Sequence, residues 1–257
     1  MKILVKLGGT LLDDADSRSR LAEQIARLHA SANEVTVVHG GGKQMTRFLT
    51  ERGVESRFVG GLRVTTPEVV DALLKVFTGS VNKTLTSVLV AAGAQAVGIS
   101  GIDAALAEAE QLNPELGQVG RITKVNPALL DTLCAAAFLP VVACVAGDRS
   151  GAIYNVNADQ MAVACAAGWG ADKLFFLTDV DGVRGRDDVS LSNLSSSEAL
   201  NLVREGVATG GMHAKLDAAC DALNRGVGEV IIAPGAAEGV LDTLAAGRPA
   251  GTRMYKG

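Results

Sequence analysis

Two glycine clusters follow short apolar runs that have the composition of strands. Gly8-Gly9 comes directly after Lys2 to Leu7, and Gly40 to Gly42 comes shortly after Val35 to Val38. Glycines between a strand and a helix let backbone N–H groups point at a ligand, and the helix dipole adds about half a positive charge there. A tight turn alone would explain one such cluster. Two of them, with Lys6 in the first run, favour a site for a phosphate or a carboxylate.

Two lysines and two asparagines occupy positions from which they could bind an anion. Lys6 lies inside an apolar strand, where it either extends to solvent or faces a ligand at the strand end. Lys215 follows Thr209 to Met212, and we expect it in the first turn of a helix, where a cation opposes the helix dipole unless an anion is bound. Asn157 is expected to cap the helix that carries Asp159, which leaves Asn155 unexplained.

Three common enzyme fingerprints are absent. The dinucleotide pattern fails because Met45 stands where the third glycine belongs, and the P-loop pattern fails because Asn82 precedes the lysine. The nucleophile elbow fails at Ile102. The histidines lack the spacing of metal ligands, so we expect no metal held by the protein itself, and only His39, beside the triple glycine, lies near the candidate site.

The elements expected around these residues alternate between apolar strands and amphipathic helices, as in a parallel sheet covered on both faces. The sequence therefore predicts an α/β protein, a three-layer αβα sandwich with a central, mainly parallel sheet. Further strands are expected at 96–99, 138–145, 173–177 and 230–233, and helices at 17–30, 69–91, 128–137, 159–168, 198–204 and 213–224. A turn-rich connection is expected at 148–154 and a polar loop at 184–197. The polar, acidic segment at 101–120 is expected to form a hairpin or a flap.

Composition limits the partners. The 257 residues carry 24 Lys+Arg against 28 Asp+Glu, a net charge of −4, with no basic block for nucleic acid or an anionic membrane. The most apolar stretch, 134–147, is shorter than the roughly 20 residues of a membrane span. No signal segment follows Met1, so a cytoplasmic location is expected. The four cysteines are widely spaced, which favours buried, reduced thiols.

Seven motifs occur in the order of one family and over nearly the whole chain: VKLGGTLL at 5–12, VVHGGG at 37–42, GLRVTT at 61–66, NKTL at 82–85, NVNADQ at 155–160, LTDVDGV at 177–183 and TGGMHAKLDAA at 209–219. With them the chain resembles the amino acid kinase family, and most of all those members that phosphorylate the side-chain carboxylate of N-acetyl-L-glutamate with ATP in arginine biosynthesis. The resemblance implies one domain over 1–257 with two approximate lobes. Residues 1–150 would bind the acyl amino acid and form a homodimer, and residues 151–257 would bind ATP with Mg²⁺.

The resemblance also implies roles for single residues. Lys6 and Lys215 would contact the phosphoryl group in transfer, Gly9 and Gly41 would donate N–H groups to it, and Asp159 would lie between the lysines and organise them. The acyl amino acid would be held by Gly41, Gly42, Arg63, Asn155 and Asn157, with Arg63 on its α-carboxylate. The ATP site would be lined by Lys6, Gly8, Gly9, Thr178, Asp179, Val180, Asp181, Gly182, Val183, Thr209, Gly210, Gly211, Met212 and Lys215.

Kinase chemistry suits these residue types. A glutamate side chain with a pKa near 4.3 is already ionised at pH 7, so no general base is needed. The reaction needs alignment and neutralisation of the phosphoryl oxygens, which two lysines and backbone N–H groups supply. Mg²⁺ keeps several waters and takes few protein ligands, so it needs no cluster of carboxylates.

The alternatives concern the acceptor and the class of protein. Lys43 replaces an expected proline, and Gly101 to Asp103 departs from a more lysine- and glycine-rich flap, which bears on the acyl group. Succinylglutamate, acetylaminoadipate and carrier-bound aminoadipate remain alternative acceptors, as do aspartate, UMP, carbamate and glutamate. A non-catalytic nucleotide sensor and an NAD-dependent oxidoreductase are the alternatives from other classes. Because the first strand starts almost at Met1, we also expect a homodimer that is insensitive to arginine.

Overall fold

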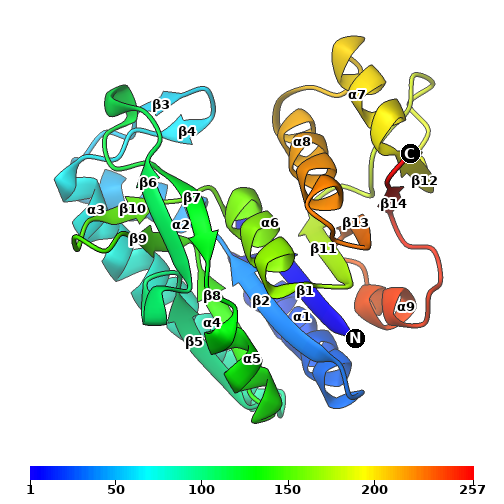
Figure 1. Ribbon diagram of the computed structural model, residues 1–257, viewed down its shortest axis with the longest axis horizontal. Coiled ribbons are helices and arrows are strands. Elements are labelled where there is room, and N and C mark those ends of the chain that lie inside the picture. Colours follow the sequence, from blue (N-terminus) through cyan, green and yellow to red (C-terminus); the bar gives the residue numbers. More distant parts are fainter.

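The computed structural model describes residues 1–257 and has an eight-stranded sheet at its centre (Figure 1). The strands, in spatial order, are β12 (Asn193–Ser195), β14 (Thr252–Tyr255), β13 (Glu229–Pro234), β11 (Lys173–Thr178), β1 (Lys2–Leu7), β2 (Glu34–His39), β8 (Leu139–Ala143) and β5 (Ala96–Ser100). Neighbours run parallel except β13 and β14. The central strands are buried on both faces, which explains their continuous apolar sequences.

Helices cover both faces of this sheet, so the predicted fold class is confirmed (Figure 1). On one face, α1 (Ala15–Ala30) packs against α4 (Asn82–Ala91) and α9 (Val240–Ala245). On the other, α6 (Ala158–Trp169) packs against α8 (Gly210–Asn224), and Trp169 donates a 3.0 Å hydrogen bond to Asp131 of α5 (Ala128–Ala135). Local sequence sets the helix limits: Asp14 caps α1, and Gly170 ends α6 in a left-handed conformation.

A smaller four-stranded sheet accompanies the main one. Its order is β10 (Ile153–Asn155), β9 (Val145–Gly147), β6 (Ala107–Gln111) and β7 (Gly120–Val125). The excursion at 101–120 is therefore an antiparallel hairpin. The expectation of a single strand at 138–145 was wrong, because the chain leaves the main sheet after β8 and enters the small sheet at β9. The connection expected at 148–154 likewise ends in β10.

The helix expected at 69–91 is one continuous helical run with a change of pitch. It consists of α3 (Pro67–Leu73), the π-helix η2 (Leu74–Val81) and α4. Two more short elements flank the candidate site, the helix α2 (Gly42–Thr50) and the hairpin of β3 (Phe58–Val59) and β4 (Leu62–Arg63).

The C-terminal end holds more structure than expected. The polar connection at 184–197 contains β12, the expected last strand is followed by α9 and β14, and α7 (Ser196–Arg204) begins two residues early with a capping box. These missed strands are three and four residues long, too short for an apolar pattern to stand out.

None of the helices combines the length and the apolar character that crossing a membrane requires. All four cysteines are buried and unpaired, as expected.

Candidate active site

The two glycine clusters meet at the carboxyl ends of β1 and β2, which are parallel neighbours. A Cβ built on Gly9 would lie 3.6 Å from the backbone nitrogen of Gly42, so the two turns are adjacent. Gly9 and Gly42 are the first residues of the helices η1 (Gly9–Leu12) and α2, and Gly41 precedes α2, so their N–H groups have no partner within these helices. The dipole of α2 adds positive character at Gly42. These free donors form a cradle for an anion.

The π-helix η2 explains why Gly41 must be glycine. A Cβ on Gly41 would lie 2.9 Å from the ring of Phe77 and 3.3 Å from Val81, both on η2. Real Cβ atoms essentially never come within 3.0 Å of an atom of a non-neighbouring residue, so the glycine allows the close approach of the backbone to the Phe77 ring. Sequence reasoning missed Phe77, which looked like one apolar position among many in a long helix.

Lys6, Asp159 and Lys215 form one chain of charges next to the cradle. The Lys6 Nζ lies 2.6 Å from Oδ1 of Asp159, and the Lys215 Nζ lies 3.5 Å from its Oδ2. The three side chains are only 8%, 12% and 18% exposed in chain order. Asp159 therefore holds two cations that come from opposite ends of the sequence.

The charge of Asp159 depends on these two cations. Burial alone raises the pKa of a carboxyl group, but the attraction of Lys6 and Lys215 outweighs it and lowers the pKa of Asp159 below its ordinary value. The carboxylate is therefore ionised at neutral pH. With one negative and two positive charges, the cluster keeps a net positive charge for an anionic ligand.

The expectation that Lys215 lies in the first helical turn was wrong. The helix α8 begins at Gly210, three residues earlier than expected, so Lys215 lies in its second turn. The dipole argument therefore applies weakly, and the ion pair with Asp159 accounts for its position instead. Thr209, Gly210 and Gly211 are exposed at the start of α8, and Met212 is half-buried.

The two asparagines differ in what they do. Asn157 caps α6, because its side-chain oxygen accepts hydrogen bonds from Asp159 N (2.9 Å) and Gln160 N (3.2 Å). Asn155 lies on β10 and donates to the hydroxyl of Thr65 at 3.0 Å. The cap fixes where Asp159 begins its helix, and Asn155 belongs to the wall of the site.

Arg63 is buried without a carboxylate partner. It is 8% exposed, and no acidic oxygen lies within 4.0 Å of its guanidinium. It donates to the Gly42 carbonyl (3.2 Å), to Thr46 (2.8 Å) and to Ser56, and it lies 4.6 Å from the centre of the Phe58 ring. Burial lowers the pKa of Arg63, although an arginine remains charged at any physiological pH. A buried cation without a counter-charge is expected to bind an anionic ligand.

A cavity of about 210 Å³ connects Lys6 and the glycine cradle with Arg63 and Asn155. It is lined by Lys6, Gly9, Gly40, Gly41, Gly42, Phe58, Gly61, Leu62, Arg63, Phe77, Val119, Cys144, Asn155, Val156, Asn157 and Ala158. One part of the lining is cationic and rich in backbone donors, and the rest is mostly apolar apart from Asn155 and Asn157. The cavity thus suits a small molecule with more than one anionic group and an apolar part.

The remaining predicted residues form the loop after β11. A Cβ on Gly8 would lie 3.2 Å from the Leu177 carbonyl, so this loop starts beside the first glycine turn. Thr178, Gly182 and Val183 are buried, whereas Asp179, Val180 and Asp181 are exposed.

Thr252 of β14 ties the far end of this loop in place. Its hydroxyl accepts from Val183 N at 2.8 Å and donates to the Leu191 carbonyl at 2.6 Å. The left-handed φ of +143° at Gly182 brings the loop within contact of Thr252. Sequence reasoning missed Thr252, because no local signal connects residues 69 positions apart.

Two groups near the site have structural roles. Burial lowers the pKa of His39 to about 4, so the ring is neutral; Nδ1 donates to the Gly40 carbonyl, and Nε2 accepts from Asn82. Burial raises the pKa of the Cys144 thiol to about 12, which excludes a thiolate nucleophile at neutral pH. No group of three or more His, Cys, Asp or Glu side chains is arranged to hold a metal ion.

Comparisons with known proteins identify the family of this chain. A family model described as the amino acid kinase family matches residues 1–234. The chain is 63% identical over 254 residues to an acetylglutamate kinase of Solibacter usitatus, covering 99% of both chains. It is 44% identical over 255 residues to an acetylglutamate kinase of Deinococcus radiodurans, covering 98% of this chain and 99% of that one.

Solved structures show the same fold. An N-acetylglutamate synthase from Neisseria gonorrhoeae, complexed with coenzyme A and N-acetyl-glutamate, superimposes with a TM-score of 0.89 at 25% identity; all of this chain aligns, with 59% of that one. A carbamate kinase from Giardia lamblia bound to AMP-PNP gives a TM-score of 0.76 at 18% identity, over all of this chain and 98% of that one. By the family model and its relatives, this chain is a member of the amino acid kinase family.

Proposed function

We propose that this protein transfers the γ-phosphoryl group of ATP to the side-chain carboxylate of N-acetyl-L-glutamate, as a step of arginine biosynthesis. The relatives named acetylglutamate kinase support this function over the full length of the chain. The observation that carries it is one cavity whose lining contains both the uncompensated Arg63 and Lys6, the lysine that Asp159 pairs with Lys215. N-acetyl-L-glutamate has two carboxylates and one small acyl group, which match these features.

Arg63 would bind the α-carboxylate of the substrate. Its guanidinium is held by three hydrogen bonds and faces a cavity that contains no other counter-charge. Three of its five N–H groups are used in these bonds, so the remaining N–H groups and the positive charge are available to a carboxylate. Asn155 and the apolar side chains of the cavity would contact the acylated amine.

The side-chain carboxylate would then lie at the glycine cradle. There one carboxylate oxygen forms a bond to the γ-phosphorus of ATP while the bond from phosphorus to the β–γ bridging oxygen breaks, which gives an acyl phosphate and ADP. Lys6, Lys215 and the N–H groups of Gly9 and Gly41 would neutralise the phosphoryl oxygens during transfer. Asp159 would position both lysines without touching the substrate.

ATP would enter along the loop of 178–183 and the start of α8, with Mg²⁺ bound to its phosphates as part of the substrate. The Thr252 contacts fix one end of this loop, and the exposed residues Gly210 and Gly211 form the N-terminus of α8, which suits phosphate oxygens. In this arrangement residues 1–150 form the acyl amino acid lobe and residues 151–257 the ATP lobe. We further propose a homodimer, for which β5 offers an edge strand that pairs only with β8.

The test is a comparison of acceptors. Acyl phosphate trapped as hydroxamate is measured with N-acetyl-L-glutamate, N-succinyl-L-glutamate and N-acetyl-L-aminoadipate at equal concentrations of MgATP. We expect the highest kcat/KM with N-acetyl-L-glutamate. A higher value with either other acceptor, or ATP binding with no turnover on any of them, would overturn the proposed substrate.

A further inference from the structure

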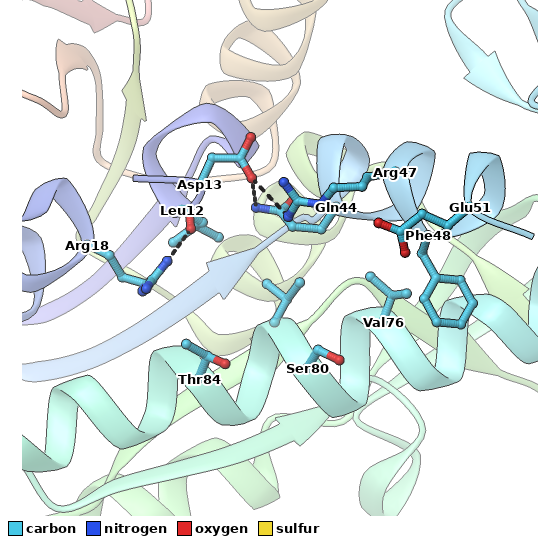
Figure 2. Close-up of a pocket in the computed structure, with 11 residues that line it drawn as sticks. Leu12, Asp13, Arg18, Gln44, Arg47, Phe48, Glu51, Val76, Ser80 and Thr84 are labelled. Atoms are coloured by element: carbon cyan, nitrogen blue, oxygen red, sulfur yellow. Dashed lines mark hydrogen bonds and ion pairs between the residues drawn. The ribbon is translucent and has the colours of Figure 1, made fainter. Parts of the chain in front are cut away.

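A second cavity, of about 270 Å³, lies next to the candidate active site and has a separate lining (Figure 2). Its walls come from the end of the 3-10 helix η1 (Gly9–Leu12), the first turn of α1, the outer side of α2, and the run from η2 into α4. Val76, Ser80 and Thr84 follow one another along one wall. The proposed function uses no residue of this lining.

Charges in this second cavity are only partly compensated. Asp13 accepts a 3.0 Å hydrogen bond from Gln44 and lies 3.6 Å from Arg47, so those two charges offset each other. Arg18 and Glu51 have no ionic partner within 4.0 Å. The cavity therefore keeps one free cation and one free carboxylate.

Two buried polar atoms of the lining also lack partners. They are the Nε of Arg18, a donor, and the Oε1 of Gln44, an acceptor. Arg18 uses one nitrogen on the Leu12 carbonyl at 2.7 Å, which holds the guanidinium in place and leaves Nε free. A buried donor or acceptor without a partner costs free energy, so each of these atoms favours a polar ligand or water.

Figure 2 places Arg18 and Glu51 toward opposite ends of the cavity, with Val76, Ser80 and Thr84 between them. We propose that this cavity is a second ligand site for an elongated zwitterion, with its carboxylate at Arg18, its ammonium group at Glu51 and a hydrocarbon segment between them.

The second cavity shares structure with the glycine cradle. Gly9 begins η1 and Leu12 ends it, so one short helix carries a cradle donor and a wall of the cavity. Gly42 begins α2, and Arg47 lies on the same helix. Val81 lines the cavity, and its Cγ2 lies 3.3 Å from the Cβ position of Gly41. A ligand in this cavity would therefore contact elements that carry both glycine turns, and on this ground we assign the site a regulatory role on substrate affinity.

Binding is tested by calorimetry on the intact protein with three probes: 6-aminohexanoate, hexanoate and hexylamine. We expect saturable binding of 6-aminohexanoate and at least about tenfold weaker binding of each probe that lacks one charge. Failure of 6-aminohexanoate to bind saturably, or equal binding of all three probes, would overturn the site.

Variants locate the binding. Arg18→Ala and Glu51→Gln are each expected to weaken 6-aminohexanoate binding at least about tenfold. The matched controls are Arg20→Ala, whose exposed guanidinium contacts only Ser17, and Glu55→Gln on the exposed loop after α2; neither should change the affinity. Glu51→Gln is isosteric and exposed, so it does not threaten the fold. Unchanged binding in both cavity variants would refute the location.

The regulatory role has its own readout. Saturating 6-aminohexanoate is expected to change the KM for the acyl amino acid about fivefold or more in the wild type and not in Glu51→Gln. Binding without a change in KM would overturn the regulatory role. The calorimetric result does not depend on the proposed kinase function, so failure of one is distinguishable from failure of the other.

Discussion

Replacement of Arg63 by lysine tests how the substrate is oriented. The guanidinium is 8% exposed, has no acidic partner and is held by the Gly42 carbonyl, Thr46 and Ser56. Lysine keeps the charge but loses the planar guanidinium, with its fixed N–H donors, and the contact with the Phe58 ring. Hydrogen bonds to charged groups contribute about 1.5–3 kcal/mol, which corresponds to roughly a ten- to hundredfold change in affinity.

We therefore expect Arg63→Lys to raise the KM for N-acetyl-L-glutamate by roughly ten- to hundredfold, with the KM for ATP unchanged and kcat changed far less. The assay is hydroxamate formation over a range of acceptor concentrations. Arg57→Lys is the matched control, because Arg57 is exposed in the same segment and should leave every constant unchanged. A normal acceptor KM in a folded Arg63→Lys protein would refute the assignment of the α-carboxylate to this side chain.

Three further predictions follow from the same contacts. Asp159→Asn should lower kcat by about 10²–10³, since it leaves the two lysines without the carboxylate that positions them. Folding lowers the pKa of Asp159, so the variant should be less stable than the wild type above about pH 4, and this difference should vanish as the pH falls through the lowered pKa. Urea unfolding at several pH values measures the difference. Gly41→Ala should cost about 1–3 kcal/mol of stability, and Phe77→Leu in the same chain should recover part of it. The pKa of His39 is about 4 in the folded protein against 6.5 when unfolded. As the pH falls from 6.5 to 4, the free energy of unfolding should therefore decrease by about 1.4 kcal/mol per pH unit, and His39→Gln should lack this slope.

The sequence predicted those parts of the fold whose signal is local. The strands β1, β2 and β11 are continuous apolar runs because they are buried on both faces, and glycine turns mark their ends. The division of 138–145 between two sheets left no local mark, because both strands are equally apolar. The polar strand β12 pairs only with β14, which lies about 60 residues later in the sequence, so no local pattern marks it as a strand.

The candidate site was predictable in type rather than in geometry. Glycine after a strand and a lysine within it indicated an anion site from the residues alone, whereas the pairing of Lys6 and Lys215 through Asp159 was expected only from the family resemblance. The isolation of Arg63 from every carboxylate depends on long-range packing and could not be predicted from spacing. The π-helix that sets Phe77 against Gly41 is likewise hidden, since its sequence resembles that of an α-helix.

The two lysines provide the most direct test of the central claim, which is that they neutralise the phosphoryl group during transfer. The measurement is kcat for acyl phosphate formation from N-acetyl-L-glutamate in Lys6→Ala and Lys215→Ala, with Lys75→Ala as the control because Lys75 is exposed and pairs only with Asp71. We predict that each active-site variant loses at least about 10²-fold in kcat while Lys75→Ala stays normal. Near-normal kcat in either folded active-site variant would contradict the account.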